Sequence, residues 1–162
     1  GVLFKIGDYI THPMHGAGVI ESIVTKKING SQRDYYVLKL PVGDMVVMVP
    51  VSGCEDIGVR SIISRSEAEK LFSAFSEIEI SMTQNWNKRY RENMDKIKSG
   101  NLLDVASVVK GLMCRDSERG LSTSERKMLH SAKQILISEL VIATDMDYDG
   151  VEKRLCAALK EG

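Results

Sequence analysis

The spacing of the apolar residues changes once along this chain, between residues 60 and 64, and this change limits the folds open to it. Before it, apolar residues come in short runs separated by turn residues; after it, they recur every three or four residues. Alternation is typical of strands and a period of 3.6 is typical of helices. The order of the two patterns predicts an α+β protein with two domains, residues 1–60 and 61–162.

The first domain contains four or five short apolar runs with a turn signal after each. The strongest signal is Asn29-Gly30, because both residue types tolerate the positive φ that a tight hairpin requires. In the run that follows, Tyr36, Leu38 and Leu40 fall on one face, and Tyr35, Val37 and Lys39 fall on the other. Short strands with such close turns predict a small, strongly bent barrel of the SH3-like or Tudor-like kind.

The second domain is predicted to hold four or five helices with short loops. Each is opened by a residue whose side chain can accept a hydrogen bond from the free N–H groups of the first turn. The expected capping residues are Ser66, Thr83, Asn101, Ser122 and Asp147. Asn101 with Asp104, and more strongly Ser122 with Glu125, match the capping-box spacing. The less regular segment 77–82 is expected to be a linker.

Composition excludes several classes of protein. Lys and Arg together number 22 and so do Asp and Glu, so a nucleic-acid partner would have to be recognised by a local patch. No apolar run approaches the roughly 20 residues that a membrane helix needs, and the start has no signal-peptide pattern. Three widely spaced cysteines favour reduced thiols. We therefore expect a cytoplasmic protein without a membrane partner.

Signals for metal binding and catalysis are weak. His12 and His15 lie three residues apart without further ligands, and Gly16-Ala17-Gly18 lacks the third glycine of a dinucleotide loop; both are expected to belong to turns. The segment 145–150 matches the first half of a calcium loop, but Cys156 stands where the bidentate Glu should be. We expect no enzyme activity, no catalytic residue, no metal, no cofactor and no small-molecule substrate.

The most unusual segment is the predicted helix that starts after Thr83. It contains the single tryptophan of the chain, Trp86, and residues 86–98 carry five cations and two carboxylates, a local charge of +3. The spacing alone permits two interpretations. Trp86 packs into the helical core beside a solvated basic face, or it stands exposed and enters a base step while nearby cations hold phosphates.

The chain resembles the CarD/CdnL family of bacterial transcription regulators over nearly its whole length. The resemblance is carried by FKIGDYITHPMHGAGVIESI, YYVLKL after the Asn-Gly turn, GDMVVMVPV, NWNKRYRENMDKIKSG and VASVVKGLMCRDSERGLSTSERKMLHSAKQILISEL. It implies a Tudor-like domain that binds the RNA polymerase β subunit, a module shared with transcription-repair coupling factors. It also implies a helical domain that contacts promoter DNA in the minor groove near the −10 element, and association with the nucleoid through polymerase.

The resemblance assigns roles to residues in both domains. Trp86 matches the wedge that stabilises the open promoter complex at the upstream edge of the bubble, and Lys88, Arg89 and Arg91 match basic DNA-contacting positions. For polymerase we expect Lys26, with Lys27, Ile28 and Met48 as neighbours; Met48 stands where family members often have a basic residue.

Two other functions are compatible with the residues. In one, the protein is an adaptor on polymerase whose helical domain binds another protein and not DNA. In the other, it is an autonomous repressor, but no recognition helix with base-reading spacing is evident.

Overall fold

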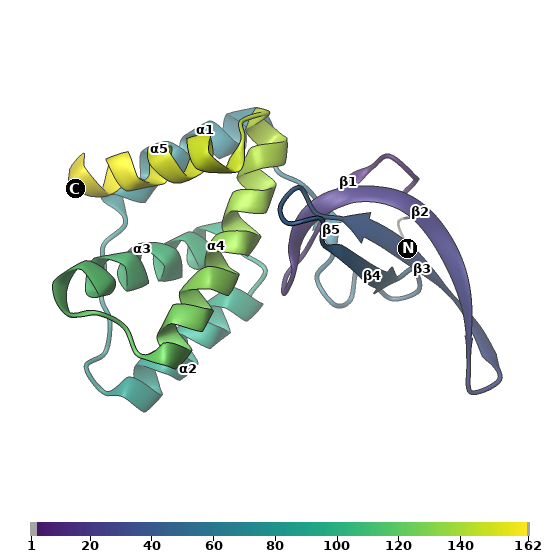
Figure 1. Ribbon diagram of the computed structural model, residues 1–162, viewed down its shortest axis with the longest axis horizontal. Coiled ribbons are helices and arrows are strands. Elements are labelled where there is room, and N and C mark those ends of the chain that lie inside the picture. Colours follow the sequence, from purple (N-terminus) through teal and green to yellow (C-terminus); the bar gives the residue numbers. More distant parts are fainter. Residues whose placement is uncertain (1–2, 162) are drawn as a thin grey trace.

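Two lobes lie side by side in the computed structural model, which describes residues 3–161 (Figure 1). The first lobe is a five-stranded antiparallel sheet and the second is formed by helices α1 to α5. The predicted α+β class, with a small β domain before an all-α domain, is confirmed. Within the described residues, no helix is long and apolar enough to cross a membrane.

The sheet follows the chain order apart from its last strand. Its strands, in the spatial order β4-β3-β2-β1-β5, are β1 (Tyr9–His12), β2 (Gly16–Ile28), β3 (Ser31–Lys39), β4 (Val46–Pro50) and β5 (Arg60–Ser61). Asn29 and Gly30 have φ of 52° and 80° and form the predicted turn between β2 and β3. These two long strands curve away from the rest of the sheet as a hairpin that points away from the helices (Figure 1).

The inner face of the sheet carries the core of the β domain. Tyr36, Leu38 and Leu40 are buried, as the alternation predicted, and they pack with residues from all the longer strands: Ile10, Ile20 and Val49. The hydroxyl of Tyr36 accepts a hydrogen bond from the backbone N–H of Phe4 at 3.0 Å. Each fully buried aliphatic side chain contributes about 1.5–3 kcal/mol. The core therefore holds a sheet that is open to solvent on its other face.

The helical lobe is built around its longest helix. The helices are α1 (Arg65–Glu77), α2 (Trp86–Lys98), α3 (Leu102–Arg119), α4 (Thr123–Thr144) and α5 (Tyr148–Glu161). Helix α4 contributes Leu136, Ile137 and Leu140, each fully buried, to one apolar cluster with the other helices. Its length lets it contact α3, α5 and strand β2.

The residues that cap the helices can be compared with the predicted capping residues. Asn101 and Ser122 are N-caps as predicted, and Asp147 accepts a hydrogen bond from the N–H of Gly150 at 2.7 Å. Two predictions are wrong by two residues. Ser64, not Ser66, caps α1: Ser64 and Glu67 form a capping box, whereas Glu69, three residues after Ser66, pairs with Arg154. Asn85, not Thr83, caps α2.

Two hydrogen bonds explain why α2 begins at Trp86 and not two residues earlier. The side chain of Asn85 accepts from the N–H of Lys88 at 3.0 Å, whereas the hydroxyl of Thr83 donates to the carboxylate of Glu92 at 3.1 Å. Trp86 is therefore the first residue of the helix, not the third. At this position Trp86 lies at the end of the helix, and it is 40% exposed.

The acidic segment after α4 is structural. Asp145 ends α4 in the left-handed conformation, with φ of 58°, and Asp147 caps α5. Among the described residues, no group of three or more His, Cys, Asp or Glu side chains gathers where it could hold a metal ion. His12 and His15 pack ring to ring in the turn between β1 and β2, at 4.6 Å between centroids.

Candidate nucleic-acid interface

The ring of Trp86 lies at the surface in a defined orientation. Its side chain is 40% exposed, which excludes the interpretation of a core tryptophan. One face stacks on Tyr90, with 5.1 Å between ring centroids and 20° between planes. Its indole N–H donates to Ser122 Oγ at 3.3 Å. Because Ser122 is the N-cap of α4, the ring joins the starts of two helices that are far apart in the chain.

Arg89 is not part of this surface. Its side chain is 2% exposed, and its Nε and Nη2 donate to the two carboxylate oxygens of Glu125 at 2.9 and 3.3 Å. Its Nη1 donates to the carbonyls of Thr83 and Gln84 at 3.1 and 3.0 Å. The predicted role of Arg89 as a DNA contact does not fit this geometry, because the guanidinium is already enclosed by protein acceptors. Arg89 instead fixes the segment before Trp86.

Glu125 completes this buried connection between α2 and α4. Burial on its own raises the pKa of the Glu125 carboxyl, but the hydrogen bonds and charge of Arg89, with help from Arg115 and Ser122, outweigh burial and hold the pKa below the ordinary value of 4.5. The carboxylate is therefore ionised at neutral pH. It holds Arg89 while Ser122, three residues before it, holds the indole of Trp86.

Lys88 and Arg91 are exposed, as a DNA contact requires. They lie on the outward face of α2, whereas Arg89, Asn93 and Ile97 form its buried face. With a rise of 1.5 Å per residue, Arg91 lies about 7.5 Å along the helix axis from Trp86 and Lys88 about 3 Å. Both cations therefore lie in the first two turns of α2, but at 3.6 residues per turn they are rotated roughly 140–160° around the helix from Trp86.

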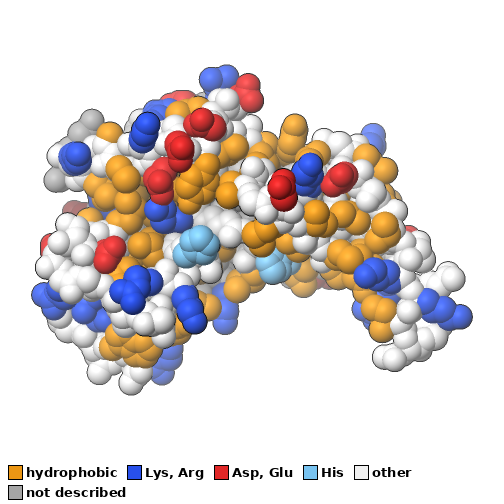
Figure 2. Space-filling model, in the orientation of Figure 1, with side chains coloured by type: hydrophobic (Ala, Val, Ile, Leu, Met, Phe, Trp, Pro, Cys, Tyr) orange, Lys and Arg blue, Asp and Glu red, His pale blue; other side chains and the backbone are white. Residues whose placement is uncertain are grey.

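The sequence reasoning missed the cations at the start of α4. Arg126 and Lys127 are exposed, and Arg126 lies one helical turn after Ser122, the partner of the indole. Figure 2 shows Lys and Arg side chains gathered over the lower part of the helical lobe, where α2 and the start of α4 lie in Figure 1. We call Trp86, Lys88, Arg91, Arg126 and Lys127 the basic face. A capping serine followed by two cations is the signal that could have identified its second half.

The predicted polymerase-binding residues separate into two groups. Side chains opposite each other in antiparallel strands share a face, and neighbours along a strand alternate. Pairing of Lys26 with Arg33 and of Met48 with Val37 places Lys26, Ile28 and Met48 on the face opposite the core. Lys27, one residue on, lies on the other face. The register thus brings three of the four predicted residues together.

We call the solvent-facing side of β2, β3 and β4 the outer sheet face. Its residues between 24 and 50 are Val24, Lys26, Ile28, Ser31, Arg33, Tyr35, Val37, Lys39, Val46, Met48 and Pro50. Val46 is 52% and Ile28 48% exposed, so apolar area is open to solvent here. Lys and Arg side chains at the far end of the hairpin are visible in Figure 2. An apolar area bordered by cations is typical of a protein-binding surface.

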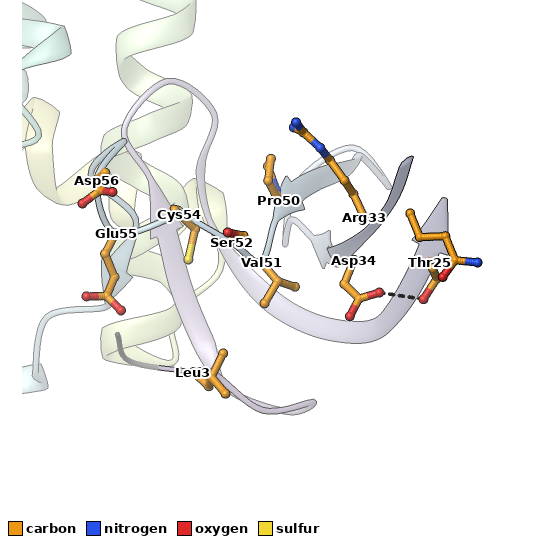
Figure 3. Close-up of a pocket in the computed structure, with 12 residues that line it drawn as sticks. Leu3, Thr25, Arg33, Asp34, Pro50, Val51, Ser52, Cys54, Glu55 and Asp56 are labelled. Atoms are coloured by element: carbon orange, nitrogen blue, oxygen red, sulfur yellow. Dashed lines mark hydrogen bonds between the residues drawn. The ribbon is translucent and has the colours of Figure 1, made fainter. Parts of the chain in front are cut away.

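A hollow of about 1080 Å³ lies beside the inner side of the hairpin. Figure 3 shows its lining, which includes Leu3, Asp34, Val51 and Asp56, and the hydrogen bond from the hydroxyl of Thr25 to Asp34 at 2.7 Å. None of the predicted site residues lines it. It is separate from the basic face and borders the outer sheet face at Arg33 and Pro50, which belong to both.

Comparison with known proteins assigns both lobes. Residues 4–63 match the family model of the CarD-like/TRCF RID domain, and residues 70–156 match that of the CarD C-terminal domain. A relative in Bacillus subtilis (strain 168), named "Putative transcription factor YdeB", is 38% identical over 140 residues, which cover 86% of this chain and 92% of the relative. The chain belongs to the CarD/CdnL family of transcription regulators.

Proposed function

We propose that this protein binds RNA polymerase through its sheet domain and promoter DNA through its helical domain, and that it stabilises the open promoter complex. The observation that carries the proposal is the exposed Trp86, held in one orientation by Tyr90 and Ser122 where two helix starts that each carry exposed cations meet. Trp and Arg also occur in protein-binding surfaces, so the salt dependence of DNA binding separates this proposal from the adaptor function.

The polymerase β subunit is the proposed partner of the outer sheet face. Lys26 supplies a cation at its hairpin end, and Ile28 and Met48 supply apolar contacts. Methionine adapts its shape to a partner surface, so Met48 makes this contact more apolar than a basic residue would. Lys27 faces the other side of the hairpin and contributes through its charge at the rim.

Promoter DNA is the proposed partner of the basic face. Trp86 enters a base step from the minor groove near the −10 element, at the upstream edge of the bubble. Lys88, Arg91, Arg126 and Lys127 hold phosphates, which fixes the position of the ring without reading the sequence. Arg89 is excluded from these contacts by its burial, and acts by holding the start of α2.

The mechanism requires no chemistry. Once the sheet domain is bound to polymerase, the basic face is held near DNA at high effective concentration, so weak DNA affinity suffices in a chain with no net charge. Unstacking a base step costs a few kcal/mol, and stacking on the indole offsets a comparable amount. Contacts made only with opened DNA shift the equilibrium, and about 1.4 kcal/mol changes the ratio of open to closed complex tenfold.

The deciding experiment is the lifetime of the open complex formed by purified polymerase with wild type and with Trp86→Ala. We expect the variant to bind polymerase normally and to shorten the lifetime about tenfold. Leu103→Ala is the matched control, because Leu103 is a comparably exposed apolar residue, 47% exposed, elsewhere in the helical domain. Equal lifetimes for wild type and Trp86→Ala would show that Trp86 does not stabilise the open complex. DNA binding that is insensitive to salt would favour the adaptor function.

A further inference from the structure

The two lobes are joined by a buried carboxylate. Glu139 of α4 is fully buried, and its oxygens accept from Arg60 Nη1 at 2.7 Å, from Arg60 Nη2 at 3.1 Å and from the backbone N–H of Ile63 at 2.8 Å. Arg60 lies on β5, and Ile63 lies in the segment that leads from β5 to α1. The bidentate pair fixes orientation as well as distance, because a guanidinium and a carboxylate must be coplanar to form it.

A second contact joins the same part of α4 to the start of β2. Ser138 Oγ accepts from the backbone N–H of Ala17 at 2.9 Å and donates to the carbonyl of Ile135 at 3.1 Å. Gly16 packs directly against the helix: a Cβ at this position would lie 2.5 Å from Ser138 Oγ and 3.3 Å from the carbonyl oxygen of Gln134. The backbone of the β domain therefore touches α4 where only glycine fits.

The two contacts and the basic face lie on one helix. Helix α4 starts at Ser122, which holds the indole of Trp86, and reaches the β domain at Ser138 and Glu139. These ends are about 24 Å apart at 1.5 Å per residue. A helix in contact with both lobes transmits position without bending, because its backbone hydrogen bonds resist it.

We propose that Glu139 is a positioning residue that locks α4 to the β domain, so that α4 serves as a rigid strut between the polymerase-binding lobe and the indole of Trp86. The functional part of this inference rests on the proposed function, but the rigid connection itself does not. With the lock intact, docking of the sheet domain fixes where the indole meets the DNA. Without it, the linking segment and the Ser138–Ala17 contact alone join the lobes, their relative orientation is less restricted, and the effective concentration of the basic face at the fork falls.

Residual dipolar couplings of the full chain test the lock directly. A single alignment tensor should fit both lobes of the wild type. Arg60→Ala removes the partner of Glu139, and we expect it to require different tensors for the two lobes. The matched control is Arg154→Ala, which breaks the bidentate pair of Arg154 with Glu69 inside the helical lobe, at 3.0 and 2.9 Å. A single tensor for Arg60→Ala and for the next variant would overturn the proposal.

Gly16→Ala tests the same junction from the other side. It places a methyl group against Ser138 and should also separate the tensors. Gly7→Ala is its control, because Gly7 has a similar φ of +95°, against +102° for Gly16, but no atom of the described residues 3–161 lies within 4 Å of its Cβ position. The dispersion of the amide spectrum shows whether each variant keeps both lobes folded, so loss of folding is not mistaken for loss of the lock.

The consequence for transcription is measured with the same variants. Arg60→Ala should retain the polymerase affinity of the wild type and the weak salt-dependent affinity for DNA alone, yet shorten the open-complex lifetime about tenfold. Arg60→Lys keeps one charged hydrogen bond and should restore part of the lifetime. A normal lifetime with separate tensors would overturn the positioning role. If Trp86→Ala also had no effect, the failure would belong to the proposed function and the tensors would still decide the lock.

Discussion

The outer sheet face and the basic face are built in opposite ways. The residues of the outer sheet face lie within one stretch, 24–50, and alternation along paired strands brings them to the surface together. The basic face joins the starts of α2 and α4, and Trp86 and Ser122 are 36 residues apart. On a strand, parity decides which face a cation lies on, whereas on a helix the neighbouring helix decides whether the cation is exposed or enclosed.

Arg89 and Arg91 show what this difference means for one residue type. They lie two positions apart on α2, yet Arg89 is enclosed by Glu125 and two carbonyls while Arg91 is exposed. Lys26 and Lys27 differ by one position and lie on opposite faces of the hairpin. Charge alone therefore identifies a contact residue in neither lobe, and the four variants that follow exploit these pairs.

The largest effect is expected at Arg89. Arg89→Ala leaves the carboxylate of Glu125 buried with only the more distant Arg115, and breaking a buried pair in this way costs about 3–5 kcal/mol of unfolding free energy. Urea unfolding measures it. Arg91→Ala should remain within about 0.5 kcal/mol of wild type. Similar losses for both variants would mean that the two arginines are not distinguished by burial.

Charge reversal on the hairpin comes next. Lys26→Glu should weaken binding to polymerase by at least about tenfold, because it places a like charge or an unpaired carboxylate in the interface. Lys27→Glu, on the opposite face, should have a smaller effect that salt largely removes. Binding of the full chain to immobilised polymerase at two salt concentrations separates the two. If the two substitutions weakened polymerase binding equally, the contact would be formed by the rim of the hairpin and not by one of its faces.

The two halves of the basic face can be compared through salt dependence. Lys88→Gln and Lys127→Gln should each reduce the slope of log K against log salt for DNA by about one, as expected when one phosphate contact is lost. Lys153→Gln, an exposed position on α5, should leave the slope unchanged. Fluorescence anisotropy with a labelled duplex gives the slopes. A change for Lys88 alone would restrict the DNA surface to α2.

The smallest expected effect is the pH dependence of the stability that the Arg89–Glu125 pair contributes. The folded-state pKa of Glu125 lies below its ordinary value of 4.5, so its pair with Arg89 contributes stability that is present above that value and is lost as pH falls through the lowered pKa. Arg89→Ala removes the main cause of the lowering. The stability difference between wild type and Arg89→Ala should therefore shrink as pH falls below 4.5, which urea unfolding at a series of pH values would show. If the stability difference did not change with pH, the contribution of Arg89 would not come from its pair with the ionised Glu125.

The sequence predicts what depends on neighbours in the chain. The Asn29-Gly30 turn and the alternation around Tyr36 predicted the hairpin and its buried face, and Ser122 with Glu125 predicted the start of α4. The fate of Arg89 could not be predicted in this way, because its partner Glu125 had already been assigned to a local capping role. The cap of α2 was likewise not predictable from spacing alone, since Asn85 accepts from the N–H of Lys88 while Thr83 donates to Glu92.

The Trp86–Ser122 hydrogen bond also makes the protein its own optical reporter. With a single tryptophan in 162 residues, all indole emission comes from one ring at the junction of two helix starts. Insertion of that ring between bases would quench its fluorescence, and unfolding would shift its emission maximum as the serine contact is replaced by water. Encounter with an opened duplex can thus be followed in stopped flow on the unlabelled protein, without a dye to disturb the surface being measured.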